Sequence, residues 1–242
     1  MHYSQVMIEL TRTCNMKCSH CIRGASQKEK LNKETFIKFL ENMEVESIES
    51  ISFTGGEPSL EHEMISFIAD ELERRNISIG SFYIATNGVV PNVGGFMASL
   101  AKLYAISDEK DMCSVSISRD DYHLESGMAT AEEVLSAFKF VQVETFSEYY
   151  LFNDGFAKDH PMATKTYDPA DTYTSIYNDV IQTDEPIYLS VNGGIGIGCN
   201  FSYDRFDNEL KFTNIDNIKN SEDFKETLIK YANEIGMEIE VD

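Results

Sequence analysis

The sequence predicts an α/β protein whose parallel strands form a closed or an incomplete (β/α) barrel. The chain has 242 residues, of which 42% are hydrophobic, and this size suits one globular domain better than two full domains. Strand-like and helix-like segments alternate from the start of the chain. Such alternation is typical of parallel strands that are joined by helical crossovers.

The individual elements follow from the spacing of apolar residues. Short apolar runs predict strands at residues 6–10, 48–53, 79–85, 112–118 and 144–152. Apolar residues that recur three or four positions apart predict helices at residues 33–43, 61–75, 95–104 and 131–140. The clearest helix has one apolar stripe, made by Met64, Ile65, Ile68 and Leu72.

The regular pattern ends after Phe152. Residues 153–186 are polar, rich in Asp and Thr, and interrupted by prolines, so we expect a loop or lid there. Order returns at residues 187–199, where the pair Asn192-Gly193 separates two strand-like runs and predicts a β-hairpin. A final helix at residues 222–235 and a short strand at residues 238–241 complete the chain.

These patterns divide the chain into three parts. We expect the first βα units in residues 1–152, a loop or lid insertion in residues 153–186, and a hairpin and helix that complete or flank the barrel in residues 187–242.

The charge of the chain argues against two classes of partner. There are 41 acidic and 20 basic residues, which gives a formal net charge of −21. Because this field repels phosphate backbones and anionic lipids, we expect neither a nucleic-acid partner nor a membrane partner. High solubility explains the acidity most simply, and a positively charged peptide or small substrate is compatible with it.

The cysteines and the apolar segments indicate a cytoplasmic location. Five cysteines are too few and too unevenly placed for a secreted disulfide framework. The N-terminus has no signal-peptide pattern, and no segment approaches the ~18 apolar residues of a membrane span.

Three cysteines form the most informative motif. Cys14, Cys18 and Cys21 lie within one short segment after the first predicted strand. Soft thiolates select zinc or an iron-sulfur cluster over hard cations. Structural zinc normally takes four protein ligands, so it would need His20 or the distant Cys199 as a partner. A [4Fe-4S] cluster with three protein thiolates leaves one iron open, where chemistry can occur.

The spacing Cys-x3-Cys-x2-Cys after a first strand resembles the signature of the radical S-adenosylmethionine (SAM) enzymes. Gly55-Gly56-Glu57-Pro58 after the second strand resembles the family's glycine-glutamate motif, which receives the amino group of SAM. Two further polar strand ends resemble positions that line the SAM pocket. They are Asn87 after the third strand, and Ser116 and Ser118 with the nearby Asp120 after the fourth.

The resemblance covers about residues 6–125 and implies fold, cofactors and reaction. The fold would be an incomplete (β/α)6 barrel with a short C-terminal extension. One [4Fe-4S] cluster and SAM would be the cofactors, and an electron donor such as flavodoxin or ferredoxin would be a partner. The implied reaction is reductive cleavage of SAM to a 5′-deoxyadenosyl radical, which abstracts a substrate hydrogen atom. The alternative class is a non-enzymatic zinc-binding or iron-sulfur-binding module that uses the same three cysteines.

Two segments have two interpretations each. His20, which precedes the third cysteine, packs near the adenine of SAM in the implied arrangement or is a surface histidine. The run from Gly194 to Gly198 resembles either the family's adenine-contacting element or the hairpin that opens the auxiliary cluster region of peptide-modifying relatives. Because Cys199 alone cannot hold an auxiliary cluster, we expect a single cluster. Cys113 is expected to be a buried apolar residue.

The substrate is the least constrained prediction. A peptide is our first expectation, on the resemblance of the hairpin alone, and a nucleotide or other small molecule is the second. Asp121, Tyr122 and His123 follow the fourth strand and are candidate catalytic residues, because His and Asp can move protons and Tyr can supply a hydrogen atom.

Overall fold

A curved, mostly parallel sheet forms the centre of the molecule in the computed structural model, which describes residues 1–126, 131–144 and 151–242. Among these residues, six neighbouring strands run parallel. In spatial order they are β10 (Ile187–Leu189), β1 (His2–Thr11), β2 (Ser47–Gly55), β3 (Ser78–Thr86), β4 (Ser114–Ser118) and β5 (Val141–Glu144). Within the described residues β5 pairs only with β4, so the sheet is open at this edge, as an incomplete barrel requires.

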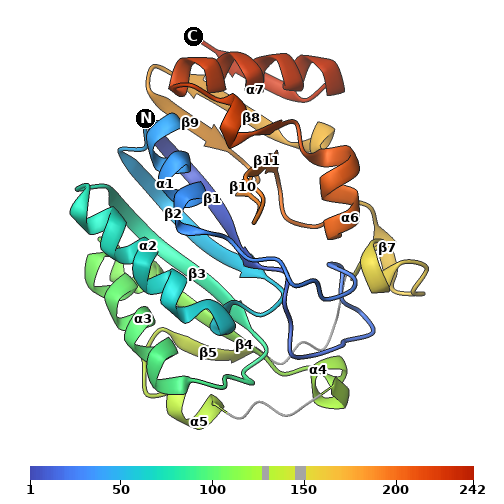
Figure 1. Ribbon diagram of the computed structural model, residues 1–242. Coiled ribbons are helices and arrows are strands. Elements are labelled where there is room, and N and C mark those ends of the chain that lie inside the picture. The colour runs from blue at the N-terminus through green and yellow to red at the C-terminus, as the bar shows by residue number, and fades with distance from the viewer. Residues whose placement is uncertain (127–130, 145–150) are drawn as a thin grey trace.

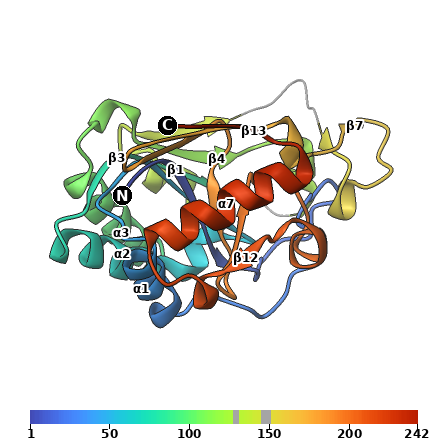
Figure 2. The ribbon, with the colours of Figure 1, turned by 90° about the horizontal axis from the view of Figure 1, so that it is seen from above.

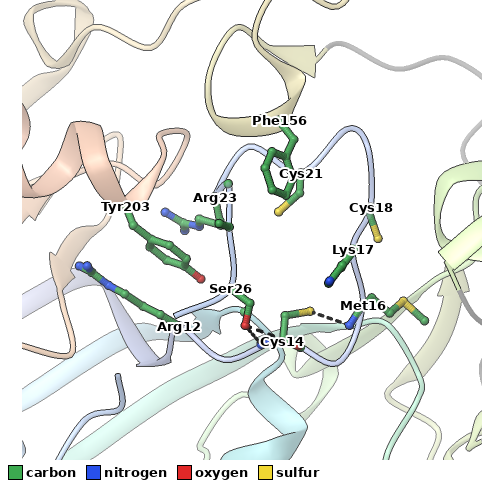
Figure 3. A pocket seen from close by; sticks show the side chains of 13 residues that line it. Arg12, Cys14, Met16, Lys17, Cys18, Cys21, Arg23, Ser26, Phe156 and Tyr203 are labelled. Atoms are coloured by element: carbon green, nitrogen blue, oxygen red, sulfur yellow. Dashed lines mark hydrogen bonds between the residues drawn. The ribbon is translucent and has the colours of Figure 1, made fainter. Parts of the chain in front are cut away.

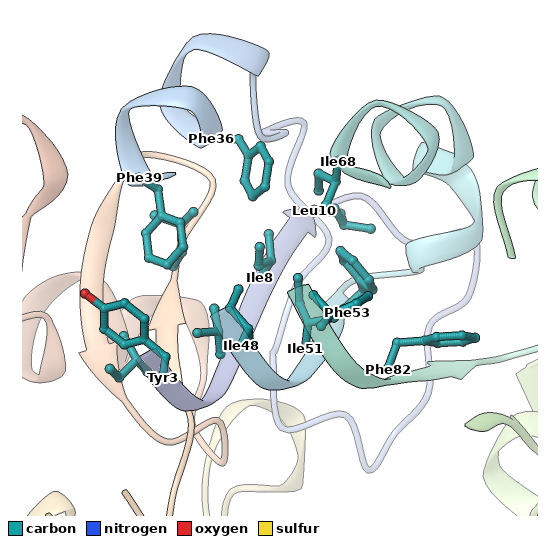
Figure 4. Packing of buried hydrophobic residues seen from close by; sticks show 14 of the residues in the cluster. Tyr3, Ile8, Leu10, Phe36, Phe39, Ile48, Ile51, Phe53, Ile68 and Phe82 are labelled. Carbon is teal, nitrogen blue, oxygen red and sulfur yellow. The ribbon is translucent and has the colours of Figure 1, made fainter. Parts of the chain in front are cut away.

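Three helices cover the outer face of the sheet (Figure 1). They are α1 (Lys33–Asn42), α2 (His62–Arg74) and α3 (Val93–Ile106). Successive side chains of a strand point to opposite faces, and one face of every central strand is apolar. Figure 4 shows Ile8, Ile51 and Phe82 of this face packed with Phe36 and Ile68 of the helices. The opposite face of β2 to β5 carries mostly polar side chains, such as Thr54, Tyr83 and Ser116, whereas beside β1 and β10 it packs against a second apolar cluster that contains Tyr188 and Phe206.

The α1 and α2 boundaries have local causes. The side chain of Asn32 accepts a hydrogen bond from the Thr35 backbone N–H and caps α1. A short 3₁₀ turn (Pro58–Glu61) precedes α2 and is capped by Glu57. The predicted strand and helix positions over this first half are confirmed within a few residues.

The fourth crossover differs from the prediction. Only a four-residue helix, α5 (Glu132–Leu135), forms within the range predicted as a helix, residues 131–140. A second short helix, α4 (Asp121–Ser126), directly follows β4. β5 already ends at Glu144, whereas a strand was predicted over residues 144–152, and β6 (Leu151–Phe152) begins later. Residues 145–150 of that predicted strand lie outside the described residues.

Residues 153–186 are not one loop or lid, and that prediction is corrected. Their elements are a 3₁₀ turn (Gly155–Ala157), β7 (Ala163–Lys165), a 3₁₀ turn (Pro169–Asp171), β8 (Tyr173–Tyr177) and β9 (Val180–Thr183). β8 and β9 form an antiparallel hairpin in which burial alternates along β9, and Asn178 takes a positive φ of 52° in its turn. Thr and Tyr, which made the segment look polar, favour half-buried strands. The three-part division of the chain stays a prediction.

The predicted hairpin at residues 187–199 is confirmed. β10 pairs in antiparallel fashion with β11 (Gly194–Ile197), and β10 also lies parallel beside β1. The sixth parallel strand therefore flanks β1 and does not follow β5. The remaining elements are α6 (Tyr203–Arg205), a π-helical turn (Phe206–Leu210), β12 (Thr213–Asn214), a 3₁₀ turn (Ile215–Asn217), α7 (Ser221–Ile235) and β13 (Glu238–Val241).

The C-terminal helix closes the core on the side of β8 and β9. Phe224 and Leu228 of α7 are fully buried, and β13 runs parallel to β8. Seen from above, α7 runs from the side of α1 toward the side of β7 (Figure 2). In the part of the chain that the structure describes, no helix is both long and apolar enough to span a membrane.

Candidate metal and cofactor site

The loop between β1 and α1 carries the three cysteines and is fastened at its base. The backbone N–H of Gln27 donates to the Arg12 carbonyl at 2.9 Å, and the Arg12 N–H donates to the Glu29 carbonyl at 2.9 Å. The Thr13 hydroxyl adds a hydrogen bond to the Gln27 carbonyl. Because both ends of the loop are joined in this way, its tip projects beyond the carboxyl ends of the parallel strands. Barrels of this kind place their sites there.

The three cysteines line one cavity of about 310 Å³ inside this loop (Figure 3). Phe156 and Tyr203 come from distant parts of the chain and close its other side. The sulfur of Cys14 accepts a hydrogen bond from the Met16 backbone N–H at 3.4 Å. No disulfide joins the cysteines, all of which lie in the described part of the chain. Three thiols around one space form a soft donor set that fits a [4Fe-4S] cluster and would leave one iron without a protein ligand.

Burial raises the pKa of the Cys14 thiol to about 11, while the Met16 N–H opposes this shift. The bare thiol is therefore protonated near neutral pH. Binding of a metal cluster must displace this proton, which couples metal affinity to pH.

Buried charges anchor the loop to the hairpin side of the sheet. Arg12, which is 1% exposed, donates to the carboxylate of Glu9 at 3.2 Å and forms two hydrogen bonds with Asp207 at 2.5 and 2.9 Å. Burial lowers the pKa of the Arg12 guanidinium, but Asp207 and Glu9 outweigh burial and raise it. Arg23 is also buried, donates to the Phe201 carbonyl and the Thr54 hydroxyl, and lies 5.2 Å from the Phe201 ring.

A second cavity, of about 180 Å³, adjoins the cysteines and unites most of the predicted cofactor residues. It is lined by Cys14, Cys18, His20, Cys21, Gly55, Gly56, Glu57, Pro58, Asn87, Ser118 and His123, together with Met16, Thr54, Ala85 and Thr86. These residues come from the loop after β1 and from the carboxyl ends of β2, β3 and β4. Parallel topology alone explains this convergence, because it brings the same end of each strand to one edge.

The two glycines after β2 allow its end to lie against the base of the cysteine loop. Gly55 has a positive φ of 139°, and a Cβ there would lie 2.0 Å from the Thr11 carbonyl oxygen. A Cβ on Gly56 would lie 2.2 Å from the carbonyl oxygen of Thr13. The N–H groups of Gly56 and Glu57 donate to these same carbonyls, at 2.7 and 2.9 Å. The glycines therefore hold the loop in place, besides opening the cavity.

Glu57 ties β2 to β3. Its buried carboxylate accepts hydrogen bonds from the Ser59 N–H at 2.9 Å, the Thr86 hydroxyl at 2.7 Å and the Asn87 N–H at 2.8 Å. Burial raises the pKa of this carboxyl, and the hydrogen bond from Asn87 opposes the shift most strongly. Both oxygens thus have partners within the chain, so a direct contact of Glu57 with SAM stays a prediction.

The serines of β4 have different environments. Ser118 lines the second cavity, whereas Ser116 is 1% exposed and lines neither cavity described above. A predicted contact between Ser116 and SAM is therefore not supported by this geometry.

The candidate catalytic residues lie around His20. The ring of Tyr122 stacks on His20 with 4.4 Å between centroids, and His123 meets His20 edge-on at 5.1 Å. Burial and the neighbouring His123 lower the pKa of His20. Asp121 is exposed and lines neither cavity.

Asp120 has a larger structural role than its sequence position indicated. One of its oxygens lies 2.6 Å from His123 Nδ1, and the other accepts from the His123 backbone N–H at 2.9 Å. Asp120 therefore caps α4 and orients His123. An Asp three residues before a His at the start of a helix is the signal that identifies this role. Sequence reasoning also missed Arg23, Phe156 and Tyr203, which tertiary contacts bring to the cysteine loop.

The glycines of the hairpin serve packing. A Cβ on Gly196 would lie 2.6 Å from the Phe206 ring, and one on Gly198 would lie 2.2 Å from the Tyr167 hydroxyl oxygen. The segment from Gly194 to Gly198 lines neither cavity, which favours the hairpin interpretation over an adenine contact. Cys113 is buried, as predicted.

Fold and site together define a class: an open parallel α/β barrel with a three-cysteine cluster loop after its first strand. A comparison with protein families matches residues 8–148 to the Radical SAM superfamily. The chain belongs to this superfamily, whose cofactors are a [4Fe-4S] cluster and SAM.

Curated relatives are named GTP 3′,8-cyclase. The protein of Pasteurella multocida is 26% identical over 144 residues, which are 55% of this chain and 39% of that protein. The protein of Pectobacterium atrosepticum is 30% identical over 87 residues, which are 34% of this chain and 26% of that protein. The alignments thus span less than half of these relatives. A solved structure, native anSMEcpe with bound AdoMet and Cp18Cys peptide, aligns with a TM-score of 0.44 and 13% identity over 94% of this chain and 80% of that one.

Replacement of Gly56 by Ala tests the packing of the loop. We expect Gly56→Ala to lower the free energy of unfolding by about 1–3 kcal/mol, because the new methyl group meets a backbone carbonyl that cannot rotate away. Gly94→Ala in α3 is the matched control. With nothing within 4 Å of the new Cβ, it should stabilise the chain by about 0.4–1 kcal/mol. Urea unfolding of both variants gives the comparison, and equal stability of the two would contradict the packing role.

Proposed function

We propose that this protein reductively cleaves SAM at a [4Fe-4S] cluster held by Cys14, Cys18 and Cys21, and that it abstracts a hydrogen atom from a substrate. One observation carries the proposal: the cavity beside the three thiols is also lined by the glycine-glutamate motif, Asn87 and Ser118. A site for zinc alone would not need a second, polar cavity built from the ends of three further strands.

The residues of this chain would bind the cluster and orient SAM beside it. Cys14, Cys18 and Cys21 would hold three irons of the cluster and leave the fourth without a protein ligand, beside the adjoining cavity that the same cysteines line. When bound, the cluster supplies the electron for the cleavage of SAM to a 5′-deoxyadenosyl radical. The backbone at Gly55 and Gly56 offers polar groups to the amino group of SAM, and Asn87 and Ser118 offer side-chain hydrogen bonds at the strand ends. The ring of His20 forms an aromatic part of the wall of this cavity.

The polar inner face of β3 to β5 is the proposed wall of the substrate chamber. Tyr83 is 37% exposed there, and Gln142 donates to the Ser114 hydroxyl at 3.0 Å. Hydroxyl and amide groups suit a substrate that the protein recognises through hydrogen bonds. His123, oriented by Asp120, is the proposed proton-transfer residue of this chamber, with Tyr122 beside it.

A peptide is the first substrate class that we propose. The β10–β11 hairpin, which resembles that of peptide-modifying relatives, supports it, and the net charge of −21 favours a cationic segment. A nucleotide is the second candidate, because the curated relatives are named GTP 3′,8-cyclase. Flavodoxin or ferredoxin as the electron donor, a cytoplasmic location and the absence of a nucleic-acid partner remain predictions.

The decisive experiment measures metal content and SAM cleavage. Protein purified without oxygen should be brown, hold about four irons per chain and release 5′-deoxyadenosine from SAM once it is reduced. A colourless protein with one zinc per chain and no cleavage would favour the non-enzymatic zinc module. Addition of basic peptides or of GTP to the same assay separates the two substrate classes, since the true substrate should accelerate formation of 5′-deoxyadenosine.

A further inference from the structure

We propose that the hydroxyl of Tyr203 donates a hydrogen bond to a sulfur atom of the cluster and thereby raises the reduction potential of the cluster. The inference rests on the proposed function, because it requires a reducible [4Fe-4S] cluster between the three thiols. It gives a role in electron transfer to a residue of α6, far from the cysteine motif in the sequence.

Tyr203 belongs to the wall of the cavity in which the cluster is proposed to lie. Its side chain is 2% exposed and lines the cavity of about 310 Å³ together with Cys14, Cys18 and Cys21. It does not line the second cavity, where SAM is proposed to bind. In Figure 3 its hydroxyl points from α6 into the space enclosed by the cysteine loop. The hydroxyl therefore faces the proposed place of the cluster and not that of SAM.

The hydroxyl of Tyr203 has no hydrogen-bond partner within the described chain. Among the described residues that line this cavity, Tyr203 is the one with a buried side-chain oxygen or nitrogen that forms no hydrogen bond. An unpaired buried hydroxyl costs free energy, and a phenylalanine would fill the same space without that cost. A phenol has one proton to donate. We therefore expect this hydroxyl to bind the group that occupies the cavity.

The other polar side chains of this wall are already bound or face solvent. The guanidinium groups of Arg12 and Arg23 both donate to other groups of the chain. The Ser26 hydroxyl is hydrogen-bonded to the backbone of Cys14, and Lys17 is exposed to solvent. Among the described side chains of the wall, the phenol is thus the buried donor that is left for the cluster.

Two contacts fix Tyr203 relative to the cysteines. The Arg12 guanidinium carbon lies 4.8 Å from the centroid of the Tyr203 ring, which is the range of a cation–π interaction. The backbone N–H of Tyr203 donates to the Arg23 carbonyl at 3.3 Å. Arg12 precedes the first cysteine of the motif and Arg23 follows the last one. Tyr203 is therefore attached to both ends of the segment that would hold the cluster.

A hydrogen bond from this hydroxyl favours the reduced cluster. Reduction adds one electron, which makes the sulfur atoms more negative, while Tyr203 keeps its proton. A donor binds the more negative acceptor more strongly, so the hydrogen bond stabilises the reduced state more than the oxidised state. Loss of the hydroxyl should therefore make the cluster harder to reduce.

The test compares two variants that each lose one buried phenol hydroxyl. Tyr203→Phe keeps the ring beside Arg12. The matched control is Tyr167→Phe, whose lost hydroxyl donates to the Ile197 carbonyl at 2.7 Å and lines neither cavity. Each cluster-loaded protein is titrated with dithionite in the presence of redox mediators and without SAM, and electron paramagnetic resonance measures the fraction of reduced cluster.

We expect Tyr203→Phe to lower the ratio of reduced to oxidised cluster by about three- to tenfold at a fixed solution potential. This change is a shift of about 30–60 mV to more negative potential, since a tenfold change equals about 59 mV for one electron. Tyr167→Phe should leave the potential unchanged. A potential in Tyr203→Phe equal to that of the unmodified protein would overturn the inference.

Two further measurements observe the hydrogen bond itself. After exchange into D₂O, pulsed paramagnetic resonance of the reduced cluster should detect one deuteron coupling that Tyr203→Phe lacks and Tyr167→Phe retains. Replacement of Tyr203 by 3-fluorotyrosine keeps the hydroxyl and makes it a stronger donor, so the potential should rise even if Tyr203→Phe fails to assemble. An unchanged or lower potential would contradict the proposal. Absence of a four-iron cluster from the unmodified protein would instead overturn the proposed function, so the two failures are distinguishable.

Discussion

Cys18→Ala should abolish both the cluster and the cleavage of SAM. We expect iron to fall from about four per chain to less than one, and 5′-deoxyadenosine formation to fall by more than about 100-fold. Loss of a direct ligand should exceed the ~10–100-fold cost of losing a group that only supports a ligand. Cys18 is buried in the wall of both cavities, beside the other two thiols. Iron analysis and chromatography of the SAM products measure the two effects.

Cys199→Ala is the matched control for this result. Cys199 lies outside both cavities, and a single cluster needs only the three thiols of the loop. The control should keep its iron and its rate of SAM cleavage. Loss of iron from Cys199→Ala would mean that a second metal site exists, and survival of cleavage in Cys18→Ala would refute the assignment of the cluster.

Arg12→Ala should be the most destabilising change away from the cysteines. The guanidinium is the direct partner of Glu9, whose side chain is fully buried. Removing one member of a buried ion pair leaves an uncompensated charge, so we expect a loss of about 3–5 kcal/mol in the free energy of unfolding. The cysteine loop is anchored through the same residue, and iron incorporation should fall with stability. Thermal and urea unfolding of the metal-free protein measure the first effect.

Two further variants distinguish the effect of an unpaired buried charge from a nonspecific loss of stability. Glu9→Gln combined with Arg12→Met removes both charges and should recover much of the lost stability, because replacing a whole buried pair costs far less than breaking it. Arg74→Ala breaks an exposed pair with Glu71 and should leave the free energy of unfolding nearly unchanged, because solvent screens exposed ion pairs. If Arg12→Ala is as mild as Arg74→Ala, the anchoring role of Arg12 is wrong.

The sequence by itself determined the features that depend on local patterns. Apolar spacing located β1 to β4 and helices α1 to α3, and Asn192-Gly193 located the hairpin, because periodicity and turn chemistry act within a few residues. The cysteine spacing and the strand-end motifs outlined the site for the same reason. Parallel strands that all end in polar residues must bring those residues to one edge.

Tertiary structure decided whatever depends on contacts between distant segments. It placed β10 beside β1, paired β8 with β9, and closed the cysteine loop with Phe156 and Tyr203. It also gave the Glu57 carboxylate three partners on β3 and the turn before α2, which no spacing in the sequence reveals. The physical reason is that burial and long-range pairing select among local alternatives. A Thr-rich and Tyr-rich segment becomes a strand only where a neighbouring strand completes its hydrogen bonds.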